Sequence, residues 1–163
     1  VTEEIMNLIV AVDENWAIGK GGDQLVYISA DLKRFKALTT GHPVILGRKT
    51  LATFPGGRPL KNRRNLILSA TPGYTVEGAE VFPDVHSLLA SAPEDAFVIG
   101  GESVYRALLD QCHTAYVTKI LSSFPADRWF PDLDAHPDWT VAEQREILEE
   151  DGIRFQYVTY RKV

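Results

Sequence analysis

The sequence has few of the features that mark secreted or membrane proteins. Its 163 residues contain one cysteine, Cys112, so no disulfide can form within the chain, which is typical of a reducing compartment. Its longest apolar runs, such as residues 8–12, are far shorter than the roughly 20 residues of a transmembrane helix. Glu3 and Glu4 do not fit the basic start of a secretory signal. We therefore expect a cytoplasmic protein that binds no membrane.

Several enzyme motifs are missing as well. The four histidines, His42, His86, His113 and His136, are scattered without metal-ligand spacing, so we expect no metal site. No nucleophile–histidine–acid arrangement is evident. The dinucleotide fingerprint G-x-G-x-x-G and the P-loop pattern G-x-x-x-x-G-K-[ST] are both absent. The chain therefore carries neither of these two common phosphate-binding signatures.

The net charge of −5 argues against a general nucleic-acid binder, but the charges are unevenly placed. Residues 31–64 contain nine lysines or arginines and one acid, a net charge of +8, whereas the rest of the chain carries −13. A solvated helix face followed by a basic loop would produce this split. A concentrated anion site would produce it too. Asp31, the single acid of the basic segment, needs its own explanation.

Strand and helix patterns alternate through the first two-thirds of the chain. Short apolar runs predict strands at residues 7–12, 43–46, 65–69, 80–82, 97–100 and 115–120. Helices are predicted at residues 30–39, 48–54, 84–92 and 101–111, with Asp84 as an N-cap and a long loop at 13–29. Asp151-Gly152 between strands at 139–147 and 153–161 indicates a hairpin. We predict an α/β fold with a mostly parallel central sheet, flanking helices and a C-terminal antiparallel hairpin, as one domain over residues 1–163.

The first predicted helix, residues 30–39, has an amphipathic pattern. Leu32, Phe35 and Leu38 recur at helical spacing and predict its buried face. Ser29 is its expected N-cap. The cations between these positions are expected to face solvent: Lys33, Arg34 and Lys36.

Three strand ends carry residues suited to anions. In open α/β sheets, ligands bind beyond the carboxyl ends of the strands. These ends read Gly47-Arg48-Lys49-Thr50, then Leu68-Ser69, then Gly100-Gly101-Glu102-Ser103, and the first and last of them open helices. Each alone is compatible with an ordinary tight turn. Together they favour a site for an extended, multiply anionic ligand, such as a dinucleotide with an extra phosphate.

The residues themselves leave two further questions open. Asp31, in the first turn of a helix, either complements the helix dipole or faces an apolar pocket where it grips a cationic heterocycle. The basic loop that follows is either exposed or supplies one bidentate partner for a ligand carboxylate. Its cations are Arg58, Lys61, Arg63 and Arg64.

A series of short segments gives the chain a family resemblance over nearly its whole length. They are residues 8–12, 17–19, 30–32 with 35–36, 43–50, 58–60 with Arg63, 65–69, 98–101 with 104–105, 116–118 and 129–131. In this order and spacing they resemble dihydrofolate reductase of the bacterial chromosomal type. The resemblance implies reduction of 7,8-dihydrofolate to tetrahydrofolate by hydride transfer from NADPH, in support of one-carbon metabolism. It also implies a monomer that can bind antifolate inhibitors.

The resemblance also implies a role for particular residues. Asp31 is the catalytic carboxylate, which holds the 2-amino and N3 edge of the pterin and promotes its protonation. The substrate side comprises Ile9, Ala11, Leu32, Phe35, Phe54, Leu60, Ile99 and Thr118, with Arg63 for the glutamate α-carboxylate. The cofactor side comprises Ala11, Ile18, Gly19, Gly47, Arg48, Lys49, Thr50, Leu68, Ser69, Gly100, Gly101, Glu102, Ser103, Val104 and Tyr105.

The chain departs from the family pattern at a few positions. Leu25-Val26 stand where Pro-Trp is usual, Ala126 where a loop glycine is common, Ala70 where a hydroxyl is frequent, and Glu102 where a third glycine is frequent. Two other hypotheses remain. A pyrimidine reductase of riboflavin synthesis shares the cofactor half, although Asp31 and Arg63 argue against it. A nucleotide-binding module without reductase activity is compatible with the altered loop.

Overall fold

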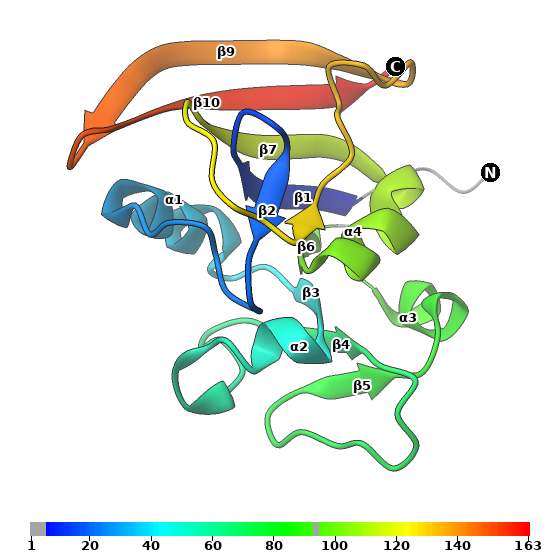
Figure 1. The fold of residues 1–163 in the computed structure, drawn as a ribbon. Helices are drawn as coiled ribbons and strands as arrows, with labels where there is room; N and C mark the ends of the chain where they lie inside the picture. The colour runs from blue at the N-terminus through cyan, green and yellow to red at the C-terminus, as the bar shows by residue number, and fades with distance from the viewer. Residues whose placement is uncertain (1–5, 93–94) are drawn as a thin grey trace.

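A computed structural model describes residues 6–92 and 95–163, and an eight-stranded sheet runs through its centre (Figure 1). The strands lie in the order β5-β4-β3-β6-β1-β7-β10-β9. Their bounds are β1 Met6–Val12, β3 Val44–Gly47, β4 Asn65–Leu68, β5 Glu80–Phe82, β6 Phe97–Gly100, β7 Cys112–Ile120, β9 Trp139–Glu150 and β10 Ile153–Lys162. The helices are α1 Ser29–Thr39, α2 Arg48–Leu51, α3 Val85–Ser91 and α4 Glu102–Leu108, and short 3₁₀ turns span Pro55–Gly57 and Leu109–Gln111.

The pairing of the strands confirms the predicted fold class. The six strands from β5 to β7 all pair in parallel, and β10 and then β9 add the antiparallel hairpin. Asp151 and Gly152 turn this hairpin with positive φ angles of 51° and 80°. Residues 44–46 and 65–67 are fully buried because helices cover both faces of the parallel part.

Helices divide the core into layers on the two faces of the sheet. Figure 1 shows α1 and α4 on opposite sides of the sheet. Val104 and Leu108 of α4 and Leu88 of α3 join the larger cluster, with Trp16 and Tyr160. On the other face, α1 and α2 cover two smaller clusters. These smaller clusters include the apolar residues that the family resemblance assigns to the substrate, except Leu32.

The long loop predicted at 13–29 is wrong in one respect, because it contains a strand. Strand β2 (Ala17–Gly19) pairs with β8 (Arg128–Trp129) in a separate small sheet. Asp13 is buried, and its carboxylate accepts hydrogen bonds from the backbone N–H groups of Ala17 and Phe124. Three residues are too few to show an alternating pattern, so no local pattern predicts β2.

Helix α1 differs from the prediction at three positions, the first of which is Leu32, predicted on the buried face but exposed. Ile28 precedes the helix, and Ser29 is its first residue rather than its cap. The carboxylate of Glu150 instead accepts from the N–H groups of Ser29 and Ala30 and from the Ser29 hydroxyl. Arg34 does not face solvent as predicted, because its guanidinium lies over the ring of Tyr157. The predicted cap of α3 is confirmed, since Asp84 accepts from the N–H of Ser87.

Most other element boundaries differ by one to three residues, as is usual for helix and strand ends. Helix α2 is shorter than predicted and ends at Leu51, while β7 begins at Cys112 and β9 continues to Glu150. Within the described ranges, no helix is both long enough and apolar enough to cross a bilayer.

Candidate functional site

Asp31 and Thr118 meet between α1 and the middle of β7. The Thr118 hydroxyl donates a 2.5 Å hydrogen bond to Oδ1 of Asp31 across 87 positions of sequence. Thr118 is buried, and Asp31 is partly buried. The structure thus places the one acid of the basic segment against the sheet, in the second of the two environments considered above.

Burial changes the acidity of this carboxyl. Desolvation raises the pKa of Asp31 above the ordinary aspartate range. The hydrogen bond from Thr118 and the positive charge of Arg34 lower the pKa but do not cancel the effect of burial. A carboxyl whose pKa is raised in this way can hold a proton closer to neutral pH, which general acid catalysis requires.

Five of the predicted substrate residues gather in one hydrophobic cluster beside Asp31. Ile9 and Ile99 are buried in it, and Phe35, Phe54 and Leu60 pack against it. Ala11 packs in the neighbouring cluster. Leu32 is not brought into this group, since it is 43% exposed.

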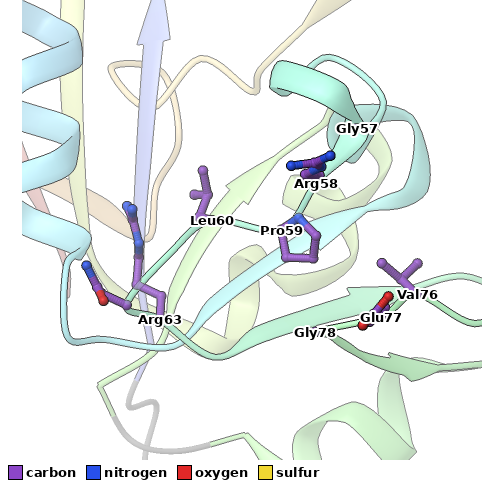
Figure 2. A pocket seen from close by; sticks show the side chains of 9 residues that line it. Gly57, Arg58, Pro59, Leu60, Arg63, Val76, Glu77 and Gly78 are labelled. Carbon is purple, nitrogen blue, oxygen red and sulfur yellow. The ribbon is translucent and has the colours of Figure 1, made fainter.

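Arg63 lines an open pocket of about 600 Å³ next to this cluster. Figure 2 shows Arg63 at one end of the pocket and Arg58 at the other, with Leu60 and Pro59 between them. Its Nη1 donates 3.0 Å to the Thr39 hydroxyl, and its Nε donates 2.8 Å to the Lys61 carbonyl. These two bonds fix the guanidinium on the end of α1.

The neighbouring arginine has a structural partner instead. Arg64 makes two hydrogen bonds of 2.9 Å with the carboxylate of Glu80, which join β4 to β5. Of the adjacent pair, Arg63 is therefore the one placed to meet a ligand carboxylate. The sequence left this choice open.

Two strand–helix junctions lie side by side at the opposite end of the site. Leu46 of β3 pairs with Gly100 of β6, so the turns that open α2 and α4 are neighbours. A Cβ on Gly101 would lie 3.3 Å from Oγ1 of Thr50, and one on Gly47 would lie 3.1 Å from Val104. The glycines thus let two backbones approach where side chains would separate them.

Gly100 also has a conformation that other residues rarely adopt. Its φ is +116°, and a Cβ there would lie 3.0 Å from the Tyr105 ring. Tyr105 is buried and donates its hydroxyl proton to the Ile9 carbonyl, 2.7 Å away. The glycine turn is therefore packed against the strand that carries Ile9 and Ala11.

Cations at these junctions face solvent. Arg48 and Lys49 are exposed and form no ion pair with any described residue. Leu68 and Ser69 end the adjacent strand β4, and both are partly buried. An anion placed here would meet unpaired positive charge and free backbone donors.

Glu102 is the one acid at the start of α4, and its side chain turns away from the junction. Its Oε2 accepts a 2.8 Å hydrogen bond from the backbone N–H of Trp129 in β8. Ser103 is exposed beside it. On the partner strand β2, Ile18 packs against the larger core and Gly19 accepts from the N–H of Asp127.

Sequence analysis missed three residues that hold these parts together. Arg34 was assigned to the solvent face, because helical spacing does not show that an arginine stem can lie along a sheet. Glu150 was not connected with α1, and Asp127, which accepts from the N–H of Gly21, was not singled out. Their partners lie more than 100 positions away, so no local pattern identifies them. Within the described part of the chain, no cluster of His, Cys, Asp or Glu is arranged to hold a metal ion.

Known proteins share this arrangement along the whole chain. The family model for dihydrofolate reductase matches residues 5–162. Dihydrofolate reductase of Bacillus subtilis (strain 168) is 35% identical over 162 residues, which cover 97% of this chain and 95% of that protein. A type 3 dihydrofolate reductase of Salmonella typhimurium is 39% identical over 132 residues, 78% of this chain and 79% of its own.

A solved structure agrees with these relatives. Dihydrofolate reductase from Enterococcus faecalis, complexed with NADP(H) and RAB-propyl, superposes with a TM-score of 0.88 at 30% identity, covering 98% of this chain and 97% of that one. The matched family model and the relatives at this identity leave one conclusion: the chain belongs to the dihydrofolate reductase family.

Proposed function

We propose that Asp31, Thr118 and Arg63 form the substrate half of a dihydrofolate reductase site, and that the α2 and α4 junctions form its cofactor half. The protein is an NADPH-dependent oxidoreductase that reduces 7,8-dihydrofolate to 5,6,7,8-tetrahydrofolate, as its family membership indicates. The observation that carries the assignment of residues is the partly buried hydrogen bond that Thr118 donates to Asp31.

Asp31 is the residue placed to act on the pterin ring. Its carboxylate matches the 2-amino and N3–H edge of a pterin, which offers two donors side by side. Thr118 occupies one face of Oδ1, so the carboxylate is held in one orientation toward the ring. Because burial raises the pKa of Asp31, the carboxyl can deliver a proton toward the ring nitrogen, through water, near neutral pH.

Arg63 and the apolar cluster position the rest of the substrate. Ile9, Phe35, Phe54, Leu60 and Ile99 form the apolar wall for the pterin and benzoyl groups, with Ala11 and Leu32 at its margins. Arg63 keeps part of its guanidinium free for the glutamate α-carboxylate, since Thr39 and Lys61 hold only Nη1 and Nε. A planar fork is suited to a carboxylate in this role.

The junctions of α2 and α4 fit NADPH. The absence of side chains at Gly47, Gly100 and Gly101 lets backbone N–H groups approach a pyrophosphate, and Glu102 is turned away from it. Arg48 and Lys49, with Thr50, Leu68 and Ser69, are placed for the adenosine and its 2′-phosphate. Ala11, Ile18 and Gly19 border the nicotinamide, and Ser103, Val104 and Tyr105 back the pyrophosphate turn. When bound, NADPH supplies the hydride.

Several wider properties belong to the same proposal. We infer that residues 1–163 form one domain that acts as a monomer in the cytoplasm and supplies tetrahydrofolate to one-carbon metabolism. The pterin pocket would also take antifolates, because such inhibitors present the same donor edge to Asp31. Nothing in the charge pattern favours nucleic acid as a partner.

One assay tests the function. Purified protein mixed with dihydrofolate and NADPH is expected to consume NADPH, followed as loss of its near-ultraviolet absorbance. Consumption of NADPH with a pyrimidine precursor of riboflavin, but not with dihydrofolate, would instead favour the pyrimidine reductase hypothesis. NADPH binding without turnover of either substrate would favour the nucleotide-binding module.

A further inference from the structure

Arg34 is a partly buried cation that forms no ion pair with a described carboxylate. It lies on α1 one turn beyond Asp31, and its Cζ is 4.0 Å from the centre of the Tyr157 ring and 6.0 Å from that of Tyr116. Its Nη1 is buried and has no hydrogen-bond partner among the described residues. It forms no ion pair with any carboxylate of residues 6–92 and 95–163.

Tyr157, over whose ring the Arg34 guanidinium lies, is connected with Asp31 through Thr118. Tyr157 of β10 is paired directly with Thr118 of β7, and Thr118 donates to Asp31. Arg34, Tyr157, Thr118 and Asp31 thus form one connected set across α1, β10 and β7. The guanidinium lies one helical turn from the carboxyl, and its positive charge acts to lower the pKa of Asp31.

The energetics of this position make the charge itself the feature to explain. Burial lowers the pKa of Arg34, but a guanidinium stays charged, so the desolvation cost is borne without an ion pair. Stacking on Tyr157 recovers part of that cost. A methionine or leucine would anchor α1 to the same aromatic rings with no such cost. Structure alone therefore does not account for a cation here.

We propose that Arg34 is a positioning residue of the reductase reaction, which fixes a positive charge one helical turn from Asp31 and so sets the pH range in which that carboxyl serves the substrate. The proposal rests on the function proposed above. It adds a residue of α1 to the reaction that family resemblance did not assign.

Other groups near this pair do not take over that role. Burial, and after it the charge of Asp31, raises the pKa of the phenols of Tyr105 in α4 and Tyr157 in β10, so both stay neutral. Arg145 and Glu143 of β9 both interact electrostatically with Arg34, but they form an ion pair with each other at 2.6 Å, so their charges offset. Arg34 and Asp31 are therefore the pair whose charges count at neutral pH.

The test is a pH profile of kcat/KM for dihydrofolate in the intact enzyme. Arg34→Met is expected to move the limb that belongs to Asp31 to higher pH, so that kcat/KM on the alkaline side of the wild-type limb rises about tenfold, the scale of one lost charge–charge interaction. That limb is identified as the one abolished by Asp31→Asn. Arg34→Lys, which keeps the charge, is expected to restore its position. Lys33→Met removes an exposed charge from the same helix and is expected to leave the profile unchanged.

A second readout separates this proposal from the proposed function. The Asp31 carboxyl is titrated by NMR in carboxyl-labelled protein, which needs no turnover, and its pKa is expected to rise in Arg34→Met but not in Lys33→Met. An unshifted pKa in a folded Arg34→Met variant would overturn the proposal, whether or not the enzyme reduces dihydrofolate. Should Arg34→Met fail to fold, Arg34→Gln keeps a planar polar group over Tyr157 and carries the same expectation.

Discussion

The two ends of the site are built in different ways. At the substrate end, hydrogen bonds between side chains far apart in the sequence fix the site. Thr118 donates to Asp31, and Arg63 donates to Thr39. At the cofactor end, the backbone of two strand–helix turns forms the binding surface, and Arg48 and Lys49 face solvent without ion-pair partners among the described residues. One end is arranged in advance around buried charge, and the other presents exposed charge to a ligand.

This difference has a physical consequence. A buried carboxyl responds to its neighbours, so burial, a hydroxyl and one cation set the pKa of Asp31. Salt at ordinary ionic strength largely screens the interactions of exposed cations with charges more than about 10 Å away. Substitutions at the substrate end should therefore change chemistry and pH dependence, whereas those at the cofactor end should change cofactor preference and its salt dependence.

The largest expected effect is at Asp31. Asp31→Asn removes the proton donor but keeps an oxygen that can accept from Thr118, so kcat/KM should fall by about 10²–10⁴ while NADPH binds as before. Steady-state kinetics and NADPH fluorescence titration measure the two quantities. Asp138→Asn, at an exposed position, is the matched control. Unchanged turnover would remove Asp31 from the chemistry.

A smaller effect is expected at the cofactor end. Arg48→Gln with Lys49→Gln removes both exposed cations, so the preference for NADPH over NADH should fall roughly 100-fold, since two charged hydrogen bonds at about 1.5 kcal/mol each, the lower end of their usual range, are lost. Raising the ionic strength should reduce the wild-type preference in the same direction. The ratio of kcat/KM for the two cofactors is the measurement, with Arg154→Gln and Arg161→Gln, two exposed arginines of β10, as controls. Equal ratios in variant and wild type would place the 2′-phosphate elsewhere.

Arg63 offers a milder change at the substrate end. Arg63→Lys keeps the charge but loses the fork that Thr39 orients, so KM for dihydrofolate should rise about tenfold with little change in kcat. NADPH affinity should stay the same. Parallel titrations of the two ligands decide the assignment, because equal weakening of both would show that Arg63 supports the fold rather than the substrate.

The contrast between the two ends also explains what the sequence could predict. The cofactor end is local, because Gly47-Arg48-Lys49-Thr50 and Gly100-Gly101 each follow a strand directly, and the order of strands places them together. The parallel sheet and the hairpin at Asp151-Gly152 were predicted from the same kind of local pattern. Tertiary structure added only how close these turns come.

Local sequence patterns do not predict the side-chain contacts of the substrate end. The position of Asp31 alone left two interpretations, and only the family resemblance connected it with Thr118, 87 positions away. Arg34 was predicted on the wrong face, because helical periodicity sorts positions by direction and does not see an aromatic ring on a distant strand. Glu150 caps α1 from 121 positions away, which also explains why Ser29 failed as the expected cap.

The smallest effect concerns stability, and it distinguishes the two ends in the absence of any ligand. A raised pKa means that folded protein holds the Asp31 proton more tightly than unfolded protein does. The contribution of Asp31 to the free energy of unfolding therefore falls as the pH rises from the ordinary carboxyl range through the raised pKa of the folded state. Asp31→Asn lacks this penalty, so it should match wild type in acid and gain of the order of 1 kcal/mol at neutral pH, a typical gain when a functional site is relieved. Urea unfolding at a series of pH values measures this gain.

Arg48→Gln should show no such trend, because the Arg48 side chain is exposed and forms no ion pair with a described residue. An Asp31→Asn variant equally destabilised at every pH would mean that the carboxylate supports the fold, and the substrate end would then not differ from the cofactor end in the way its buried charge implies.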